Sequence, residues 1–212
     1  MNKLLNIAFY LSIVTIVYNL AEGTISVLFG LEDETLALLG FGVDSFVEVI
    51  SGLGIAHMVW RMKRSDVSSR DTFERTALKI TGIAFYLLVA GLLVGATLNI
   101  VNDVEPDTTI VGIIISSISI LTMYALMKAK LNIGTQLKSD AIIADANCTK
   151  TCFYLSIILL ASSGLYELFQ IGYFDLLGSL GIAYYAYKEG KEAFGKSRSD
   201  NLSCCCDDEC SS

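Results

Sequence analysis

Two pairs of side chains that can bind metal ions occur in this chain, and each pair is spaced four residues apart: Asp44 with Glu48, and Cys148 with Cys152. On an α-helix, residues i and i+4 leave the same face, about 6 Å apart along the axis. Both pairs fall inside long apolar stretches. Ionisable groups are costly in lipid, so their presence there indicates a function. Two such pairs on facing helices would supply the four ligands of a metal site.

The composition is that of an integral membrane protein. Hydrophobic residues make up 53% of the 212 residues and charged residues only 17%, and the mean hydropathy is +0.58. Apolar stretches near or above the roughly 20 residues of a spanning helix recur six times. They cover residues 4–29, 36–60, 77–101, 109–127, 141–170 and 173–187. We therefore expect an all-α fold, an integral membrane bundle of six transmembrane helices.

The charged residues indicate how this bundle is oriented. All 15 Lys and Arg residues fall on one side of the six expected helices, whereas the connections on the other side carry acids. By the positive-inside rule, both termini are cytoplasmic. The lipid bilayer is the expected partner, with the plasma or inner membrane favoured, and nothing indicates a nucleic-acid partner. A signal peptide is the alternative for residues 1–20, although the apolar run continues through Phe29.

We expect a six-helix domain at 1–194 and a flexible, acidic, Cys-rich cytoplasmic tail at 195–212. A tail that combines thiols with acids can collect soft metal ions; its cysteines are Cys204, Cys205, Cys206 and Cys210. Palmitoylation of these cysteines and a tail without a specialised role are the alternatives. No residue pattern indicates catalysis or a tightly bound cofactor, so we do not expect an enzyme.

Polar side chains form stripes along three of the expected helices. At about 100° per residue, the stripe of the fifth helix comprises Asp145, Cys148, Cys152, Ser156, Ser163, Glu167 and Gln170. The first helix carries Ser12, Thr15, Asn19, Glu22 and Ser26, and the second carries Asp44, Glu48 and Ser51. Ser and Thr can simply join helices by hydrogen bonds. Together with the acids and thiols, however, the stripes predict a hydrated ion path that includes Asn19, Glu22 and Asp145.

Two further features bear on packing. His57, the only histidine, lies nearly opposite Asp44 and Glu48 on its helix and is expected at an interface. Gly91 and Gly95 form a GxxxG motif in the third expected helix, which allows close helix approach. The approach is either within the subunit or against another copy, so a homodimer remains open.

Two segments resemble the cation diffusion facilitator family of divalent metal transporters. In the second expected helix, Asp44-Ser-Phe-Val-Glu48 resembles the family's metal-binding Asp-Ser-x-x-Asp stretch, with Glu at the second Asp. In the fifth, residues 139–152 resemble Ser-x-Ala-Leu-x-Ala-Asp-Ala-x-His-x-x-x-Asp, with Cys148 at the His and Cys152 at the Asp. The likeness covers the six-helix region, and the family's usual cytoplasmic metal-binding domain is not expected after it.

Two more acids match the family's pattern. Asp145 falls at a family acid on the cytoplasmic side, where it either assists ion entry or caps and orients its helix. Asp175 falls about where the family carries an Asp in the sixth helix, and we include it in the expected ion path.

The resemblance implies a metal site made of Asp44, Glu48, Cys148 and Cys152, in a carrier that exports metal from the cytoplasm in exchange for protons by alternating access. The two thiols make this ligand set softer than the family's, which favours Zn²⁺ or Cd²⁺ over Mg²⁺, Ca²⁺ and Mn²⁺. Protons compete with metal for thiolates and carboxylates, as such an exchange requires. The alternatives are a metal sensor or partner subunit that does not transport, a thiol redox protein, and cysteines that only fill space.

Overall fold

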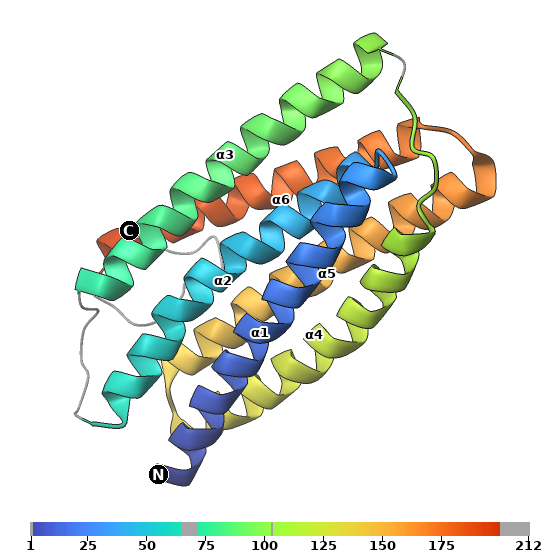
Figure 1. Ribbon diagram of the computed structural model, residues 1–212. Helices are drawn as coiled ribbons and strands as arrows, with labels where there is room; N and C mark the ends of the chain where they lie inside the picture. The colour runs from blue at the N-terminus through green and yellow to red at the C-terminus, as the bar shows by residue number, and fades with distance from the viewer. Residues whose placement is uncertain (1, 65–71, 103, 200–212) are drawn as a thin grey trace.

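The computed structural model describes residues 2–64, 72–102 and 104–199, which fold into six α-helices (Figure 1). They are α1 (Asn2–Glu32), α2 (Leu36–Met62), α3 (Thr72–Asn102), α4 (Ile110–Leu137), α5 (Asp140–Phe169) and α6 (Tyr173–Arg198). The all-α prediction is confirmed, with one helix at each expected stretch. Helices α4 and α6 extend well beyond their apolar stretches, because hydropathy marks the part of a helix suited to lipid rather than where the helix ends.

The helices run alternately up and down an elongated bundle (Figure 1). The start of α1, the end of α2, the α4–α5 turn and the end of α6 lie at one end, which we call the basic end because it carries Lys3, Arg61, Lys63, Lys138 and Arg198. The other three connections lie at the opposite end, which we call the acidic end because it carries Glu32, Asp33, Glu34, Glu105 and Asp107. Both described ends of the chain therefore lie at the basic end.

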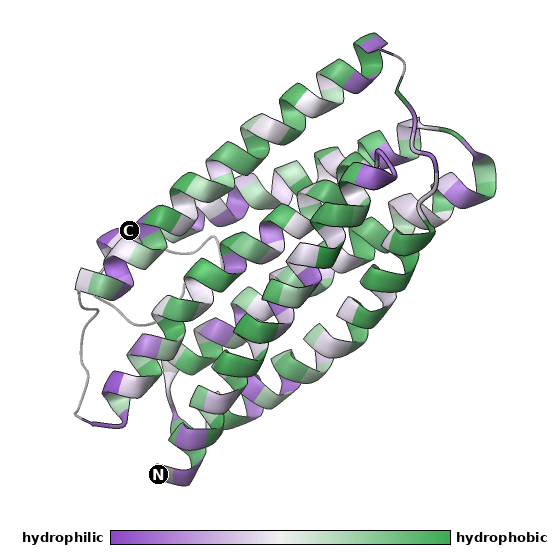
Figure 2. Ribbon diagram, viewed as in Figure 1, coloured by the Kyte–Doolittle hydropathy of each residue, from purple (hydrophilic) through white to green (hydrophobic). Residues whose placement is uncertain are grey.

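Helices α1 to α5 are each long and apolar enough to cross a membrane. Large hydrophobic side chains are exposed along their outer faces, among them Val17, Leu28, Leu87, Val94 and Leu121. Figure 2 shows hydrophobic residues along the outer surfaces of these helices, with hydrophilic residues at the two ends. This apolar exterior is compatible with an integral membrane protein. Helix α6 is more polar and falls outside this group of five.

Glycines allow α1 and α2 to approach closely in the half of the bundle nearer the acidic end. A Cβ atom at Gly42 of α2 would lie 2.8 Å from the Ser26 Cβ and from the Val27 backbone nitrogen of α1. A Cβ atom at Gly23 of α1 would lie 2.9 Å from the Gly42 carbonyl oxygen. Because real Cβ atoms do not approach this closely, Gly at both positions sets the crossing. The crossing places the polar stripe of α1 against that of α2.

The apolar core lies mainly in the half of the bundle nearer the acidic end, between α2, α3, α5 and α6. It includes Leu38, Phe41, Leu92, Leu159 and Ile182, all of which are buried. A core packed in this way leaves little room for water. Polar residues are instead gathered nearer the middle and the basic end, where they form the site described below.

The GxxxG motif of α3 does not act as one contact inside the subunit. A Cβ atom at Gly95 would lie 2.8 Å from the Leu36 side chain of α2, whereas one at Gly91 would meet no described atom within 4 Å. Gly91 is exposed on the outer face of α3. A contact of Gly91 with another copy stays a prediction.

Candidate metal site

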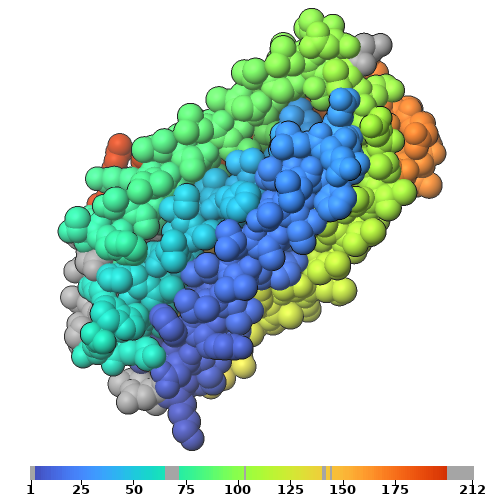
Figure 3. All heavy atoms as spheres, viewed as in Figure 1, coloured from blue at the N-terminus to red at the C-terminus, as the bar shows by residue number. Residues whose placement is uncertain are grey.

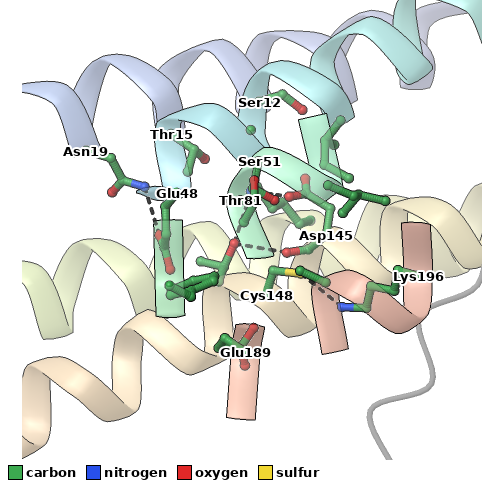
Figure 4. Close-up of a pocket in the computed structure, with 17 residues that line it drawn as sticks. Ser12, Thr15, Asn19, Glu48, Ser51, Thr81, Asp145, Cys148, Glu189 and Lys196 are labelled. Carbon is green, nitrogen blue, oxygen red and sulfur yellow. Dashed lines mark hydrogen bonds and ion pairs between the residues drawn. The ribbon is translucent and has the colours of Figure 1, made fainter. Parts of the chain in front are cut away.

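One residue of each predicted pair meets its counterpart in the middle of the bundle. The Cys152 thiol of α5 donates a hydrogen bond to the Glu48 carboxylate of α2. Asn19 of α1 donates to the same carboxylate, from Nδ2 to Glu48 Oε2, at 2.9 Å (Figure 4). Glu48 is thus held between three helices. Every residue of the α1 stripe is buried, and the residues of the α2 and α5 stripes are buried or half-buried except Gln170, which is exposed.

Asp44 lies one helical turn from Glu48, on the side of the acidic end. Its side chain is only 2% exposed, and its Oδ1 atom has no hydrogen-bond partner among the described residues. The charges that act on it belong to other acids, namely Glu48, Glu189 and Glu22. A buried carboxylate without a partner is unfavourable unless a cation or a proton neutralises it. The position of Asp44 therefore favours a bound cation or proton.

Glu22, a predicted ion-path residue, lies beside Asp44. Its carboxylate accepts hydrogen bonds from the Tyr18 hydroxyl at 2.9 Å and from the Ser45 hydroxyl at 3.2 Å. Ser45 directly follows Asp44 on α2, so the contact fixes Glu22 next to the turn that carries Asp44. Asn19 and Glu22 thus contribute from α1 to the surroundings of Glu48 and Asp44.

Cys148 lies one turn from Cys152 toward the basic end, with its sulphur 3.8 Å from the Lys196 Nζ atom of α6. Cys152 is a buried free thiol. The four predicted ligands therefore do not close around one point. Within the described part of the chain, no group of three or more His, Cys, Asp or Glu side chains is close enough to hold a metal ion. Glu48 and Cys152 meet, while Asp44 and Cys148 each lie one turn away, on opposite sides.

A cavity of about 60 Å³ extends from Glu48 toward the basic end and is lined from all six helices (Figure 4). Its ionisable lining consists of Glu48, Lys130, Asp145, Cys148, Glu189 and Lys196. Hydroxyl groups add to this polar lining, and the volume accommodates a few water molecules. On the face drawn in Figure 3, the atoms of α1, α2, α3 and α4 form the surface. Asp44 and Cys152 do not line the cavity and lie beyond its inner end.

Three charged residues of this cavity, Lys130, Glu189 and Lys196, were not predicted from the sequence. Lys196 is the residue whose ammonium lies near Cys148. Lys130 of α4 is 2% exposed and forms an ion pair with Asp145, Nζ to Oδ1, at 3.0 Å. Glu189 of α6 accepts a hydrogen bond from the Thr151 hydroxyl at 2.9 Å. Helical spacing could have indicated Lys130 and Glu189. Lys130 continues the α4 face that carries Ser116, Ser119 and Met123, and Glu189 lies fourteen residues after Asp175, close to the same face of α6.

Asp175 lies far from these residues, at the acidic end. Its carboxylate accepts hydrogen bonds from the backbone nitrogens of Leu36, at 2.9 Å, and Ala37, at 3.2 Å. It thereby binds the first N–H groups of α2, which have no partner within the helix. A negative charge at a helix N-terminus is also favourable. The structure thus gives Asp175 a capping contact rather than a place beside Glu48.

His57 lies at the basic end of α2, away from Glu48. Its ring packs against Phe73, and Nδ1 lies 3.5 Å from the Glu74 carboxylate of α3. Glu74 also pairs with Arg61 at 2.8 Å. These contacts join α2 to α3, and the expectation that His57 lies at an interface stays a prediction. The four cysteines of the predicted tail site lie outside the described residues.

No family model and no curated protein matches this chain. The resemblance to the cation diffusion facilitators therefore rests on the two motifs and on the chemistry of the residues they place.

Proposed function

We propose that this protein carries a soft divalent metal ion, Zn²⁺ or Cd²⁺, across a membrane in exchange for protons, in the manner of the cation diffusion facilitators. The observation that carries the proposal is the position of Asp44. Its carboxylate is buried, has an unpartnered oxygen, and lies one turn from the contact between Glu48 and Cys152. Those three side chains are oxygen and sulphur ligands in a membrane-like interior, where uncompensated negative charge is strongly disfavoured.

The donor types support a soft ion as the substrate. Zn²⁺ accepts thiolate and carboxylate ligands together, and thiolates shift the preference of a site away from Mg²⁺, Ca²⁺ and Mn²⁺. Glu48 and Cys152 supply the first two ligands. Asp44 and Cys148 complete the set when the ion draws their side chains inward.

The cavity supports a route to this site. It extends from Glu48 toward the basic end, whereas the packed core of Leu38, Phe41 and Leu159 lies on the other side. In the proposed function, the basic end is cytoplasmic, α6 is the sixth span with its polar face on the cavity, and both termini are cytoplasmic. An ion enters from the basic end, and the bundle then opens toward the acidic end.

The same ligands account for exchange with protons. Cys152 binds a metal ion only as the thiolate, and Asp44 and Glu48 bind it only when ionised. The thiol hydrogen that Cys152 now directs at Glu48 must therefore leave when the ion binds. Return of protons to these groups weakens metal binding and resets the carrier.

Proteoliposome flux separates this function from its alternatives. Purified protein in vesicles with an imposed pH gradient is supplied with Cd²⁺, Zn²⁺ or Mn²⁺, and uptake is followed with a trapped metal-sensitive dye. We expect Cd²⁺ or Zn²⁺ uptake that Asp44→Asn abolishes and the matched variant Glu74→Gln retains. Metal binding without flux would indicate a sensor or partner subunit. Thiol turnover without metal binding would indicate the redox alternative.

A further inference from the structure

Lys130 is a buried cation in the polar interior. Its ammonium group donates to Asp145 Oδ1 and to Thr149 Oγ1, each at 3.0 Å. Thr149 in turn donates its hydroxyl hydrogen to the Asp145 backbone carbonyl at 3.1 Å. The hydroxyl oxygen is therefore oriented to accept from Lys130. A lysine that is 2% exposed and bonded in this way is rare in an apolar bundle, and its place on the cavity indicates a role there.

The positive charge of Lys130 acts on Glu48, a residue of the candidate metal site. Lys130 lines the same cavity as Glu48, and its positive charge attracts the Glu48 carboxylate. The second ammonium of the cavity, Lys196, is 2.7 Å from Glu192 and belongs to α6. Lys130 of α4 is instead held by Asp145 and Thr149 of α5, between the entry of the cavity and Glu48.

We propose that Lys130 is a tethered cation that selects the transported metal, by occupying Asp145 and competing with the incoming ion for the cavity carboxylates. This inference rests on the proposed function and adds a selectivity determinant to it. A soft ion overcomes the repulsion of the ammonium because it gains the thiolates of Cys148 and Cys152. A hard ion such as Mn²⁺ depends on oxygen ligands, and Lys130 keeps the Asp145 carboxylate engaged.

Variants that remove the positive charge of Lys130 or the negative charge of Asp145 distinguish a role in metal selection from a purely structural role. Lys130→Met removes the ammonium and leaves Asp145 as a free carboxylate in the cavity. Asp145→Asn leaves the ammonium without its counter-ion, so that it repels an arriving cation. The double variant Lys130→Met with Asp145→Asn restores a neutral pair. A purely structural ion pair predicts that both single variants weaken metal binding, whereas selection by charge predicts effects of opposite sign.

Equilibrium dialysis of the purified full-length chain against Cd²⁺, Zn²⁺ and Mn²⁺ tests the inference, with thermal unfolding of each variant as a check on folding. We expect Lys130→Met to bind Mn²⁺ about tenfold more tightly than the wild type, and Asp145→Asn to bind Cd²⁺ about tenfold more weakly, as is typical of coupled sites. The double variant should return to the wild-type ratio of Cd²⁺ to Mn²⁺ affinity. Lys130→Arg keeps the charge and should retain that ratio.

Three results would contradict the role of Lys130 without contradicting the proposed function. They are an unchanged ratio of Cd²⁺ to Mn²⁺ affinity in Lys130→Met, a loss of affinity for both metals in Lys130→Met, and a double variant that still binds Mn²⁺ more tightly than the wild type. If Lys130→Met does not fold, unchanged Cd²⁺ affinity in Asp145→Asn contradicts this role equally. Failure of the wild-type protein to bind either Cd²⁺ or Zn²⁺ in the same dialysis overturns the proposed function instead, so the two failures are distinguishable.

Discussion

Replacing Asp44 by Asn is expected to stabilise the metal-free protein while removing its response to metal. Asp44 and Glu48 lie four residues apart, which is about 6 Å along the helix axis. At an effective dielectric constant of about 20, two unit negative charges at that distance repel by about 3 kcal/mol. No described Lys or Arg side chain forms an ion pair with Asp44 to offset this repulsion. Asparagine has the same shape without the charge, so the gain in stability has an upper limit of about 3 kcal/mol at neutral pH.

Thermal unfolding in detergent measures both effects, because Trp60 is the only tryptophan and reports on the fold. A metal at 100 times its Kd stabilises a protein by about 2.7 kcal/mol. For a chain of this size, this corresponds to a rise in Tm of about 5–10 °C. We expect the wild type to show this rise with Cd²⁺. Asp44→Asn should instead show a higher Tm without metal and little further rise with it.

Glu74→Gln is the matched control. Glu74 is as buried as Asp44, but it is paired with Arg61 at 2.8 Å. Removing its charge leaves Arg61 without this partner, so the Tm of the metal-free protein should fall while the Cd²⁺ response persists. The reasoning is refuted if Asp44→Asn lowers the metal-free Tm as Glu74→Gln does and keeps the Cd²⁺ response.

Three further predictions concern other parts of the molecule. Cys152→Ser should weaken Cd²⁺ binding by more than tenfold while changing Mn²⁺ binding little, because it replaces a soft ligand with a hard one; equal losses for both metals in a dialysis experiment would contradict this. Asp175→Ala should lower the Tm by about 2–8 °C. Two backbone N–H groups of α2 lose their acceptor in this variant, at a cost of about 1–2 kcal/mol. An undiminished Cd²⁺ response would confirm that the role of Asp175 is capping. Burial and the nearby acids Glu32 and Asp107 raise the pKa of the Asp33 carboxyl, so the native state favours its protonated form and loses stability as the pH rises past that pKa. Asp33→Asn should therefore raise the Tm by about 1–2 °C at pH 7 and have no effect below about pH 3, where the carboxyl is protonated in both states; a gain that persists at low pH would contradict the electrostatic cause.

Much of the fold could be predicted because lipid imposes simple rules on sequence. Apolar stretches long enough to span a bilayer are visible in the sequence, and each of them became a helix. The inward face of α1 was equally predictable, since its polar residues recur at helical spacing and all are buried. The contact between Glu48 and Cys152 agrees with the expected meeting of α2 and α5.

What could not be predicted depends on how helices are displaced along one another. Cys148 and Cys152 share a face, yet only Cys152 lies level with Glu48, and Cys148 lies level with Lys196 of α6. Spacing within one helix carries no information about that displacement. Asp175 shows the same limit. Its partners are backbone groups of α2, whose proximity follows from the packing of α6 against the start of α2.

The interior position of Lys130 is hidden in the sequence for a different reason. It lies in a basic segment that the positive-inside rule assigns to the membrane boundary. A long α4 instead carries it into the interior, where Asp145 neutralises it. A lone lysine on an otherwise buried helical face is therefore better interpreted together with an acid on the next helix than as a marker of topology alone.

Flux through proteoliposomes tests the central claim most directly. Vesicles containing the wild-type protein, with an acidic interior and Cd²⁺ outside, should accumulate Cd²⁺ and release protons, and vesicles containing Asp44→Asn should do neither. Wild-type vesicles that take up no Zn²⁺ or Cd²⁺ under either direction of pH gradient would contradict the account. Uptake that is unchanged in Asp44→Asn would show that the ion does not pass through the proposed site.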